Sequence, residues 1–559
     1  MREMLRCLAL GDPVILENGT ESGNCVDSRL LEWLLFSAEA LREVHPNGIW
    51  IHGGVFLKSL TLSRARVDRP VALLHCEFRE SVHCHFLEVQ HLAFEQSTFC
   101  KGLAACYMRV EHGLFMDGIV SHAGVALWGT VIGGPLNLNG AKLSEDEHGV
   151  ALEASGVTVG GDVSMTRGFE ATGEVRFVAA ECRHNVGCLG ATITNPSGKT
   201  LNGNGIRVGK SVFLSEGFSA HGKVDLISAQ VGGNLLMHDA VIRGADADSV
   251  VLDLSNAQIV GFIGMVEHWN GDCACLVRGR VVLRHARCGQ FDDSPEVWRG
   301  WGRDGCDEKP AVTIDVDGFT YQGLGVHPQS LDLEFRKVWL ARGSGADRRS
   351  FSPQPYNQLA GVLHDAGHEQ RARQVRIARD RELFVEIDRP AADTVWRKVL
   401  LGLHWLLVCW LLAYGYSTRR TVAALLGMWI FGAAVFWGGW ATGSFKPALP
   451  HIYNSWVEQI DQVTGEPVIA MDDPLRRRTY VQRYRGSYKD LASSQLTEYP
   501  GFMSLIYSAD TLLPIVNLHQ EPYWEPTGWT RVYLWVHIVG GWLFTTLAVV
   551  GFTGIVRRD

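Results

Sequence analysis

The sequence predicts a multidomain β and α membrane protein: a cytosolic β-solenoid, a helical-hairpin connector, and two transmembrane helices with a short pore-like helix between them. Three observations predict this fold class. Short stretches ending in an apolar residue recur every 10 or 11 residues in the first part of the chain. A glycine-containing pattern returns 49 residues after its first appearance. Long apolar runs are confined to the end of the chain.

Length and composition limit the number of domains and the classes of partner that are possible. A chain of 559 residues is too long for a single core and predicts two to four domains. The net charge of -8 leaves no broad basic excess to pair with phosphates, which argues against a nucleic-acid partner. Thirteen scattered cysteines and the lack of a signal-peptide succession at the N-terminus favour reduced thiols in the cytosol.

Residues 1–48 are expected to form an N-terminal helical cap. The segment "SRLLEWLLFSAEAL", from Ser28 to Leu41, has the apolar spacing of one helix face. Ser28 is a possible N-cap residue for this helix, because a serine hydroxyl can accept an early backbone N–H.

Residues 49–320 are expected to form a β-solenoid. The recurring apolar positions are spaced too closely for a helical repeat, and the spacing suits one strand plus one turn. They are Val67, Phe78, Val89, Phe99, Val110, Val120 and Val131.

A longer internal repeat supports the solenoid. "VGGDVSMTRGFEATGEVRFVAAE" starts at Val159, and "VGKSVFLSEGFSAHGKVDLISAQ" starts at Val208. Glycine recurs where a tight corner needs positive φ, and apolar residues recur where strands face a shared interior. One unit cannot bury its apolar side alone, so stacked coils of roughly two short repeats are expected. A twisted sandwich is the alternative, but it does not explain the register of the small residues.

Two segments resemble the pentapeptide-repeat-like and related β-helix proteins of bacteria. They are "GGPLNLNGAKL", from Gly133 to Leu143, and "VGGNLLMHDAVI", from Val231 to Ile242. The resemblance covers about residues 49–265, although a strict five-residue period does not hold. It implies a rigid cytosolic rod that serves as a binding or spacing module, and it implies no catalytic residues.

Two motifs suggest chemistry and are better explained by packing. "NGIRVGKS", from Asn204 to Ser211, is one residue from a phosphate-binding loop, but the strand and turn expected after it do not supply the required helix. "LHCEFRESVHCHF" contains thiol and imidazole groups, yet along a strand Cys84 points away from His83 and His85. We therefore expect no catalytic residue, no metal and no cofactor.

Residues 321–390 are expected to form a helical-hairpin connector, with Gly367 at its turn. The hairpin resembles tetratricopeptide-type helix pairs, but one pair is too few for a repeat array, so a cap and adaptor is favoured over a peptide-binding groove. Its second helix is basic. These basic residues can be explained as the solvent-exposed face of the helix. Alternatively, they attract the anionic head groups of membrane lipids. The membrane-proximal basic candidates are Arg376, Arg379, Arg397, Lys398, Arg419 and Arg420.

Residues 391–559 are expected to interact with the membrane. An interfacial helix is predicted within 391–420, and crossings at 421–442 and 533–556. The alternative is that the apolar run 399–416 also crosses, which would place the N-terminal domain and the C-terminus on opposite sides of the membrane. With two crossings, the basic residues at both ends of the module lie on the side of the rod. The positive-inside rule then places the N-terminal domain and the C-terminus in the cytosol of a bacterium, and the loop 443–499 outside its inner membrane.

Between the two crossings, residues 502–513 are expected to form a pore-like helix within the two-span module 421–559. This order of elements resembles the two-transmembrane pore module of the potassium-channel-like ion channels, with Thr511 where the filter begins. A potassium filter needs glycines after that threonine, and "TLLPIVNLHQ" contains none, so potassium selectivity is not expected. The pore-lining candidates are Asp510, Thr511, Asn517, His519, Glu521 and His537.

These expectations give one leading hypothesis. A cytosolic solenoid sensor or scaffold, binding an unknown protein or ligand, would be coupled to an ion-channel-like pore in the lipid bilayer. A two-span module encloses no pore alone, so a cyclic homo-oligomer is expected, with a tetramer favoured. The runner-up is a non-conducting membrane-anchored scaffold or assembly protein. A membrane-associated oxidoreductase is the third alternative, and no nucleophile, base and oxyanion donors are recognisable together.

Overall fold

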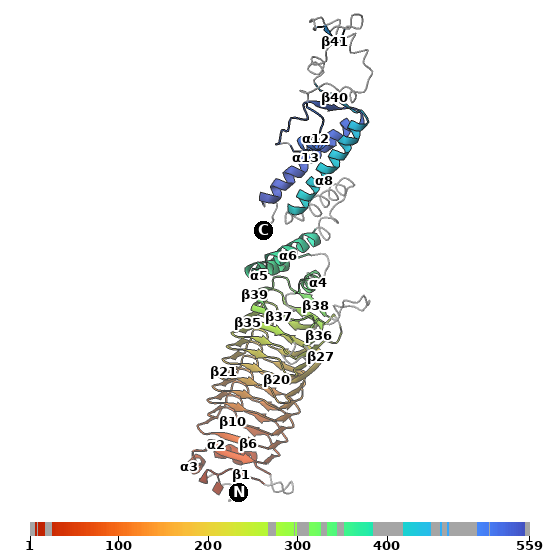
Figure 1. Cartoon of the computed structure of the whole chain (residues 1–559). Coiled ribbons are helices and arrows are strands. Elements are labelled where there is room, and N and C mark those ends of the chain that lie inside the picture. Colours follow the sequence, from red (N-terminus) through yellow and green to blue (C-terminus); the bar gives the residue numbers. More distant parts are fainter. Residues whose placement is uncertain are drawn as a thin grey trace. The chain divides into compact units, whose positions relative to one another are not determined.

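The chain divides into two units, residues 1–386 and 387–559 (Figure 1). The first unit contains two large parallel sheets and the second contains helices. The computed structural model describes residues 6–7, 9–16, 25–37, 39–246, 248–266, 275–295, 297–298, 312–325, 332–343, 351–383, 418–448, 459–460, 467–468, 500–513 and 515–553.

The first unit is a β-solenoid, as predicted. Each of the early coils gives two short strands to a first sheet and two to a second, and neighbouring coils pair in parallel. In later coils one longer strand replaces such a pair, as β35 (Gln258–Met265) does by pairing with both strands of the coil before it. One coil consists of β9 (Glu88–Val89), β10 (Leu92–Ala93), β11 (Thr98–Phe99) and β12 (Leu103–Ala104), and β13 (Arg109–Val110) then returns to pair with β9. Each coil therefore contains two of the short repeats, which confirms that prediction.

The recurring apolar residues form buried columns through the solenoid. Val67 pairs with Val89, Val89 with Val110, and Val110 with Ile132, and all four side chains are buried. At Val120 and Val131 the inward positions belong instead to the following residues, Ser121 and Ile132.

The physical reason for this difference is the two-residue period of a strand. Phe99 pairs with Ser121, so the coil advances 22 residues at this point, one more than the spacing from Val89 to Val110. A shift of one residue turns a side chain to the opposite face of the sheet. The inward Ser121 satisfies its hydroxyl by donating to the carbonyl of Gly124 at 2.9 Å.

The 49-residue repeat corresponds to two coils, since Val159 pairs with Cys182 and Cys182 pairs with Val208. Alternate coils contain extra residues at one corner of the second sheet. Thr194 and Lys199 in β27 (Thr192–Asn202) pair with His221 and Lys223 in β30 (Ser219–Asp225), so five residues of one coil match two of the next. Similar expansions lie between Leu143 and Val150 and between Arg243 and Val250.

The tight coil of each pair turns the same corner at a glycine, namely Gly173, Gly222 or Gly279. Gly222 has φ +135°, and a Cβ built on it would lie 2.2 Å from the carbonyl oxygen of Asn195. The extra residues of the preceding coil fill the space that a side chain would need. Glycine is therefore required by both backbone conformation and contact.

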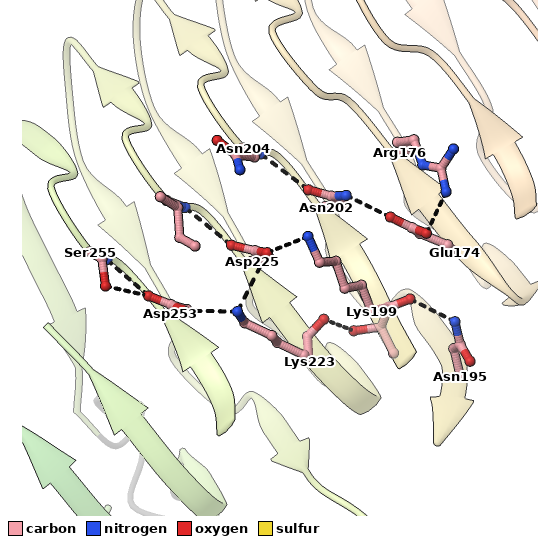
Figure 2. Close-up of polar contacts among 12 residues, drawn as sticks. Glu174, Arg176, Asn195, Lys199, Asn202, Asn204, Lys223, Asp225, Asp253 and Ser255 are labelled. Atoms are coloured by element: carbon pink, nitrogen blue, oxygen red, sulfur yellow. Dashed lines mark hydrogen bonds and ion pairs between the residues drawn. The ribbon is translucent and has the colours of Figure 1, made fainter. Parts of the chain in front are cut away.

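Polar side chains from successive coils lie above one another on the second sheet, next to this corner, as Figure 2 shows. The Asp225 carboxylate is 1% exposed, with Lys199 Nζ at 2.6 Å and Lys223 Nζ at 3.5 Å. Lys223 Nζ also lies 2.8 Å from Asp253. The other oxygen of Asp253 accepts the backbone N–H of Ser255. Each acid thus holds the turn that follows it and is neutralised by a lysine, as burial of a carboxylate requires.

At the N-terminal end of the solenoid lie α2 (Ser28–Phe36) and α3 (Ala40–Glu43). The N-cap of α2 is Asp27, whose side chain accepts the backbone N–H of Arg29, so the prediction of Ser28 as the cap was wrong. Ser28 is buried instead, and its hydroxyl donates to the carbonyl of Lys58. The solenoid contact thus takes the hydroxyl that could have capped the helix.

At the other end, α4 (Leu333–Gly343), α5 (Gln354–Asp365) and α6 (Glu369–Leu383) share the solenoid core. Gly367 lies at the turn between α5 and α6 with φ +79°, which confirms the predicted hairpin. Arg336 of α4 forms a buried ion pair with Asp293 of β37 (Arg287–Asp293), and Trp298 Nε1 also donates to this carboxylate at 2.9 Å. This pair fixes α4 to the last coils.

The second unit contains α8 (Thr418–Ala441), α12 (Ser504–Leu512) and α13 (Trp529–Thr553). The short α12 packs against both long helices. The antiparallel strands β40 (Phe445–Pro447) and β43 (Trp524–Pro526) join the ends of α8 and α13, and β41 (Gln459–Ile460) pairs with β42 (Pro467–Val468).

Within the described residues, one helix is long and apolar enough to cross a membrane, Val422–Ala441 in α8. The second crossing at 533–556 stays a prediction. The interfacial helix expected at 391–420 lies outside the described residues, except for 418–420 at the start of α8. Most of the loop 443–499 also lies outside them.

Replacing Gly222 tests the corner. We expect Gly222→Ala to lower the free energy of unfolding by about 3 to 5 kcal/mol, because it adds both backbone strain and a steric clash. The control is Gly205→Ala, where φ is also positive but no atom lies within 4 Å. The equivalent positions on the neighbouring coils are Ala179 and Ser228, which have positive φ without being glycine. We therefore expect Gly205→Ala to lower the free energy of unfolding by only about 1 kcal/mol. Equal losses in denaturant titrations followed by circular dichroism would contradict this explanation.

Candidate functional site

A buried polar cluster joins the three helices of the second unit. His537 of α13 is fully buried, and its Nε2 lies 3.2 Å from both the hydroxyl and the carbonyl oxygen of Ser508 in α12. The Ser508 hydroxyl donates to the carbonyl of Trp429 in α8 at 2.8 Å. On the other side of the ring, His537 Nδ1 lies 3.3 Å from the hydroxyl of Tyr533. We call these four residues the His537 cluster.

A glycine makes room for the His537 cluster. A Cβ on Gly432 of α8 would lie 2.3 Å from Cε1 of His537 and 2.5 Å from the Ser508 hydroxyl. The edge of Phe436 closes another side, with ring centroids 5.3 Å from His537. Such close approach at a small residue is typical of helices packed in membranes, where polar side chains bond across the interface.

The loop after α12 is organised by Asp510. Its carboxylate accepts three backbone N–H groups, from Leu518 at 2.6 Å and from Gln520 and Glu521 at 2.8 Å each. Gln520 turns back to the start of α12, where its Oε1 accepts the N–H of Met503. Asp510 therefore closes residues 515–521 into a loop held against the short helix.

The other predicted pore-lining residues divide into two groups. Thr511 is buried and donates to the carbonyl of Tyr507 within its own helix. Asn517, His519 and Glu521 are exposed in the loop. Thr511 and His537 thus face the interior of a single bundle, while three polar side chains remain at its surface.

The basic candidates are also placed differently from one another. Arg376 is partly exposed on α6, whereas Arg379 is buried in the hairpin, where its guanidinium donates to Asn357 and pairs with Asp380. Arg419 and Arg420 lie in the first turn of α8. Arg397 and Lys398 lie outside the described residues.

The motif similar to a phosphate-binding loop and the segment with thiol and imidazole groups both lie in the solenoid. Asn204–Ser211 includes β28 (Arg207–Val208) and is followed by β29 (Val212–Phe213), which confirms that a strand follows this motif in place of a helix. As predicted, Cys84 is buried and His83 and His85 lie on the opposite face of the strand. The two imidazole rings stack on one another. Among the described residues, no three His, Cys, Asp or Glu side chains are grouped so as to hold a metal ion.

Sequence reasoning missed Ser508, Trp429 and Gly432. Ser508 lies in the predicted short helix, three residues before Thr511, so helical periodicity would have placed both on one face. No signal in the sequence relates Trp429 or Gly432 to that face, since the pairing depends on how two helices far apart in the chain pack.

None of the protein-family models, curated proteins and solved structures compared with this chain matches it. Its function is therefore argued from its own residues and their geometry.

Replacing Asp510 tests its structural role. We expect Asp510→Ala to lower the protection of the backbone amides of 518, 520 and 521 at least about tenfold in hydrogen exchange, because three donors lose a charged acceptor. The matched control is Asn517→Ala in the same loop, whose side chain accepts only the N–H of His519 among the described contacts. Equal effects of the two variants would contradict the assignment to Asp510.

The buried thiols give a second test, which bears on the oxidoreductase alternative. Burial raises the pKa of Cys84 and of Cys188 to about 12, so the nucleophilic thiolate is scarce at neutral pH. We expect both to resist iodoacetamide in the folded protein and to react after denaturation, as read by peptide mass spectrometry. The partly exposed Cys100 serves as the accessible control. Native alkylation of Cys84 at the rate of Cys100 would contradict the prediction.

Proposed function

We propose that this chain is a bacterial inner-membrane protein in which a cytosolic β-solenoid is coupled to an ion-channel-like module of two spans. The observation that carries the proposal is the short helix α12, which packs between two long helices and is followed by a loop bonded back to Asp510. This order and packing are those expected of a pore helix between two crossings.

The physical argument concerns the loop backbone. Irregular backbone at membrane depth is tolerated only where protein buries it or where it lines water. In the single chain, Ile515, Asn517 and Leu518 are exposed. If α8 and α13 both cross, several copies around a common axis would give these residues a shared, water-lined centre. A cyclic homo-oligomer, with four copies favoured, satisfies this requirement.

The surfaces of α8 and α13 support membrane insertion of both helices. From Val532 to Thr553 the sequence contains no Asp, Glu, Lys or Arg. Large apolar side chains are exposed along both helices, which suits contact with lipid or with neighbouring copies. They include Leu426, Ile430, Phe431, Trp437, Val532, Trp535, Val539, Trp542 and Val549.

In this proposal the lining comes from the loop. Asn517, His519 and Glu521 are exposed, so they are the polar groups available to an axis. Thr511 and His537 are buried inside the bundle, where they form hydrogen bonds within the chain, and are not part of this lining. Without glycine in this segment, a row of carbonyls like a potassium filter is not proposed, and the pore would select weakly.

The solenoid would act as the sensor or scaffold, a rod of the pentapeptide-repeat-like kind that binds a cytosolic protein or ligand. The buried Asp293–Arg336 pair between the last coils and α4 suits a rigid joint that passes movement to the hairpin. The exposed Arg371 and Arg381 of α6 and the partly exposed Arg376 would attract anionic lipid heads at the cytosolic surface.

A non-conducting membrane anchor is the second candidate. One observation favours it: the most buried polar groups of the second unit, Ser508, Thr511 and His537, bond within a single chain. Such a bundle satisfies its buried polar groups within one chain and does not need other copies around a central pore.

Ion flux separates the two candidates. We expect purified oligomer in liposomes to release a trapped ion gradient, and Glu521→Gln to shift the ratio of cation to anion flux, because it removes a charge from the lining. Asp510→Ala should also alter flux by freeing the loop. The control is Glu111→Gln on the solenoid. No flux from any oligomeric preparation, with or without solenoid-binding candidates, would favour the anchor.

A further inference from the structure

The His537 cluster has one arrangement of protons that satisfies every polar atom in it. The Ser508 hydroxyl donates to the carbonyl of Trp429, so toward His537 it can only accept. His537 Nε2 must then carry the proton that is donated to Ser508. Nδ1 of the same neutral ring is left as an acceptor, and the Tyr533 hydroxyl donates to it.

This chain of donors fixes α12 to both long helices. Ser508 is the one residue of α12 that contacts Trp429 of α8 and His537 of α13 through its own polar atoms. A second bond, from Trp429 Nε1 to the carbonyl of Leu505 at 2.9 Å, also joins α8 to α12. Because the His537 side chain is fully buried, its bond to Ser508 is made away from water and cannot be replaced by solvent.

Among the residues that the structure describes, no anion is placed to neutralise a charged His537. Of the described groups that face the ring, α8 contributes the Trp429 carbonyl, Gly432 and Phe436, and α12 contributes Ser508. On α13 itself Tyr533 is the titratable neighbour. The carboxylate of Asp510 is bonded to the loop amides, and Glu525 pairs with Arg531.

We propose that neutral His537 is the positioning residue that holds α12 between the long helices, and that its protonation releases α12. This inference does not depend on ion conduction, since a non-conducting anchor would contain the same cluster.

The proton balance is simple. One hydronium ion of the solvent transfers its proton to Nδ1 and becomes water, the bond from the Tyr533 hydroxyl to that nitrogen is lost, and the ring gains one positive charge. A buried cation without an anion is costly, so the ring must reach water. It can do so only if the contact with Ser508 opens, which separates α12 from α13.

Hydrogen exchange of the amides of 504–512, read by mass spectrometry and corrected for the intrinsic pH dependence of exchange, tests the proposal. The full-length protein is placed in lipid nanodiscs at about pH 7.5 and about pH 5, which bracket histidine titration. We expect the wild-type protein to lose protection about tenfold or more at the lower pH.

Three variants make the test specific. His537→Gln retains an N–H donor toward Ser508 and does not titrate, so α12 should stay protected at both pH values. His537→Ala should leave α12 poorly protected at both. The exposed His519→Gln, only eight residues beyond α12's Thr511, should retain the wild-type response.

Two results would overturn the proposal. One is equal protection of the wild-type α12 at both pH values. The other is an acid-induced loss in His537→Gln as large as in the wild type, which would assign the response to another group. If His537→Ala fails to fold, the comparison among wild type, His537→Gln and His519→Gln still decides.

Discussion

Parallel main-chain pairing between successive coils is the constraint on which the first unit depends. Each short strand bonds to the coil before it and to the coil after it, so every coil must return in register. Extra residues can leave the stack only at a corner. The expansions near Thr194 and Arg243 do so, and the next coil then needs Gly222 or Gly279 to pass beneath them. The 49-residue period of the sequence follows from this alternation.

The second unit depends on a comparable constraint of close packing, but with polar groups at its centre. Gly432 allows α8 to approach His537, and the imidazole in turn connects α12 and α13 through Ser508. Both ends of α12 are therefore specified: Asp510 closes the loop after it, and Gln520 of that loop bonds to Met503 before it. A short helix that could not be stable alone is held by these contacts.

The solenoid was largely predictable because its signals are local and repeated. Spacing and recurrent glycines predicted a solenoid with about two short repeats in each coil, and a single extra residue moves the inward positions from Val120 and Val131 to Ser121 and Ile132. The second unit was less predictable. Its short helix was visible between Phe502 and Leu513, yet the contacts of Ser508 and His537 with α8 join residues more than 70 positions apart in the chain. Asp510 was chosen as a lining group, whereas its carboxylate serves the loop amides.

The central claim is that α12 lies between two membrane crossings, with the loop before it outside and the C-terminus in the cytosol. Labelling of single introduced cysteines with a membrane-impermeant maleimide tests it most directly. We expect Ser487→Cys to react in intact cells from which the outer membrane has been removed, and Asp559→Cys to react only after the inner membrane is permeabilised. Reaction of both positions under the same condition would place them on one side and contradict the claim.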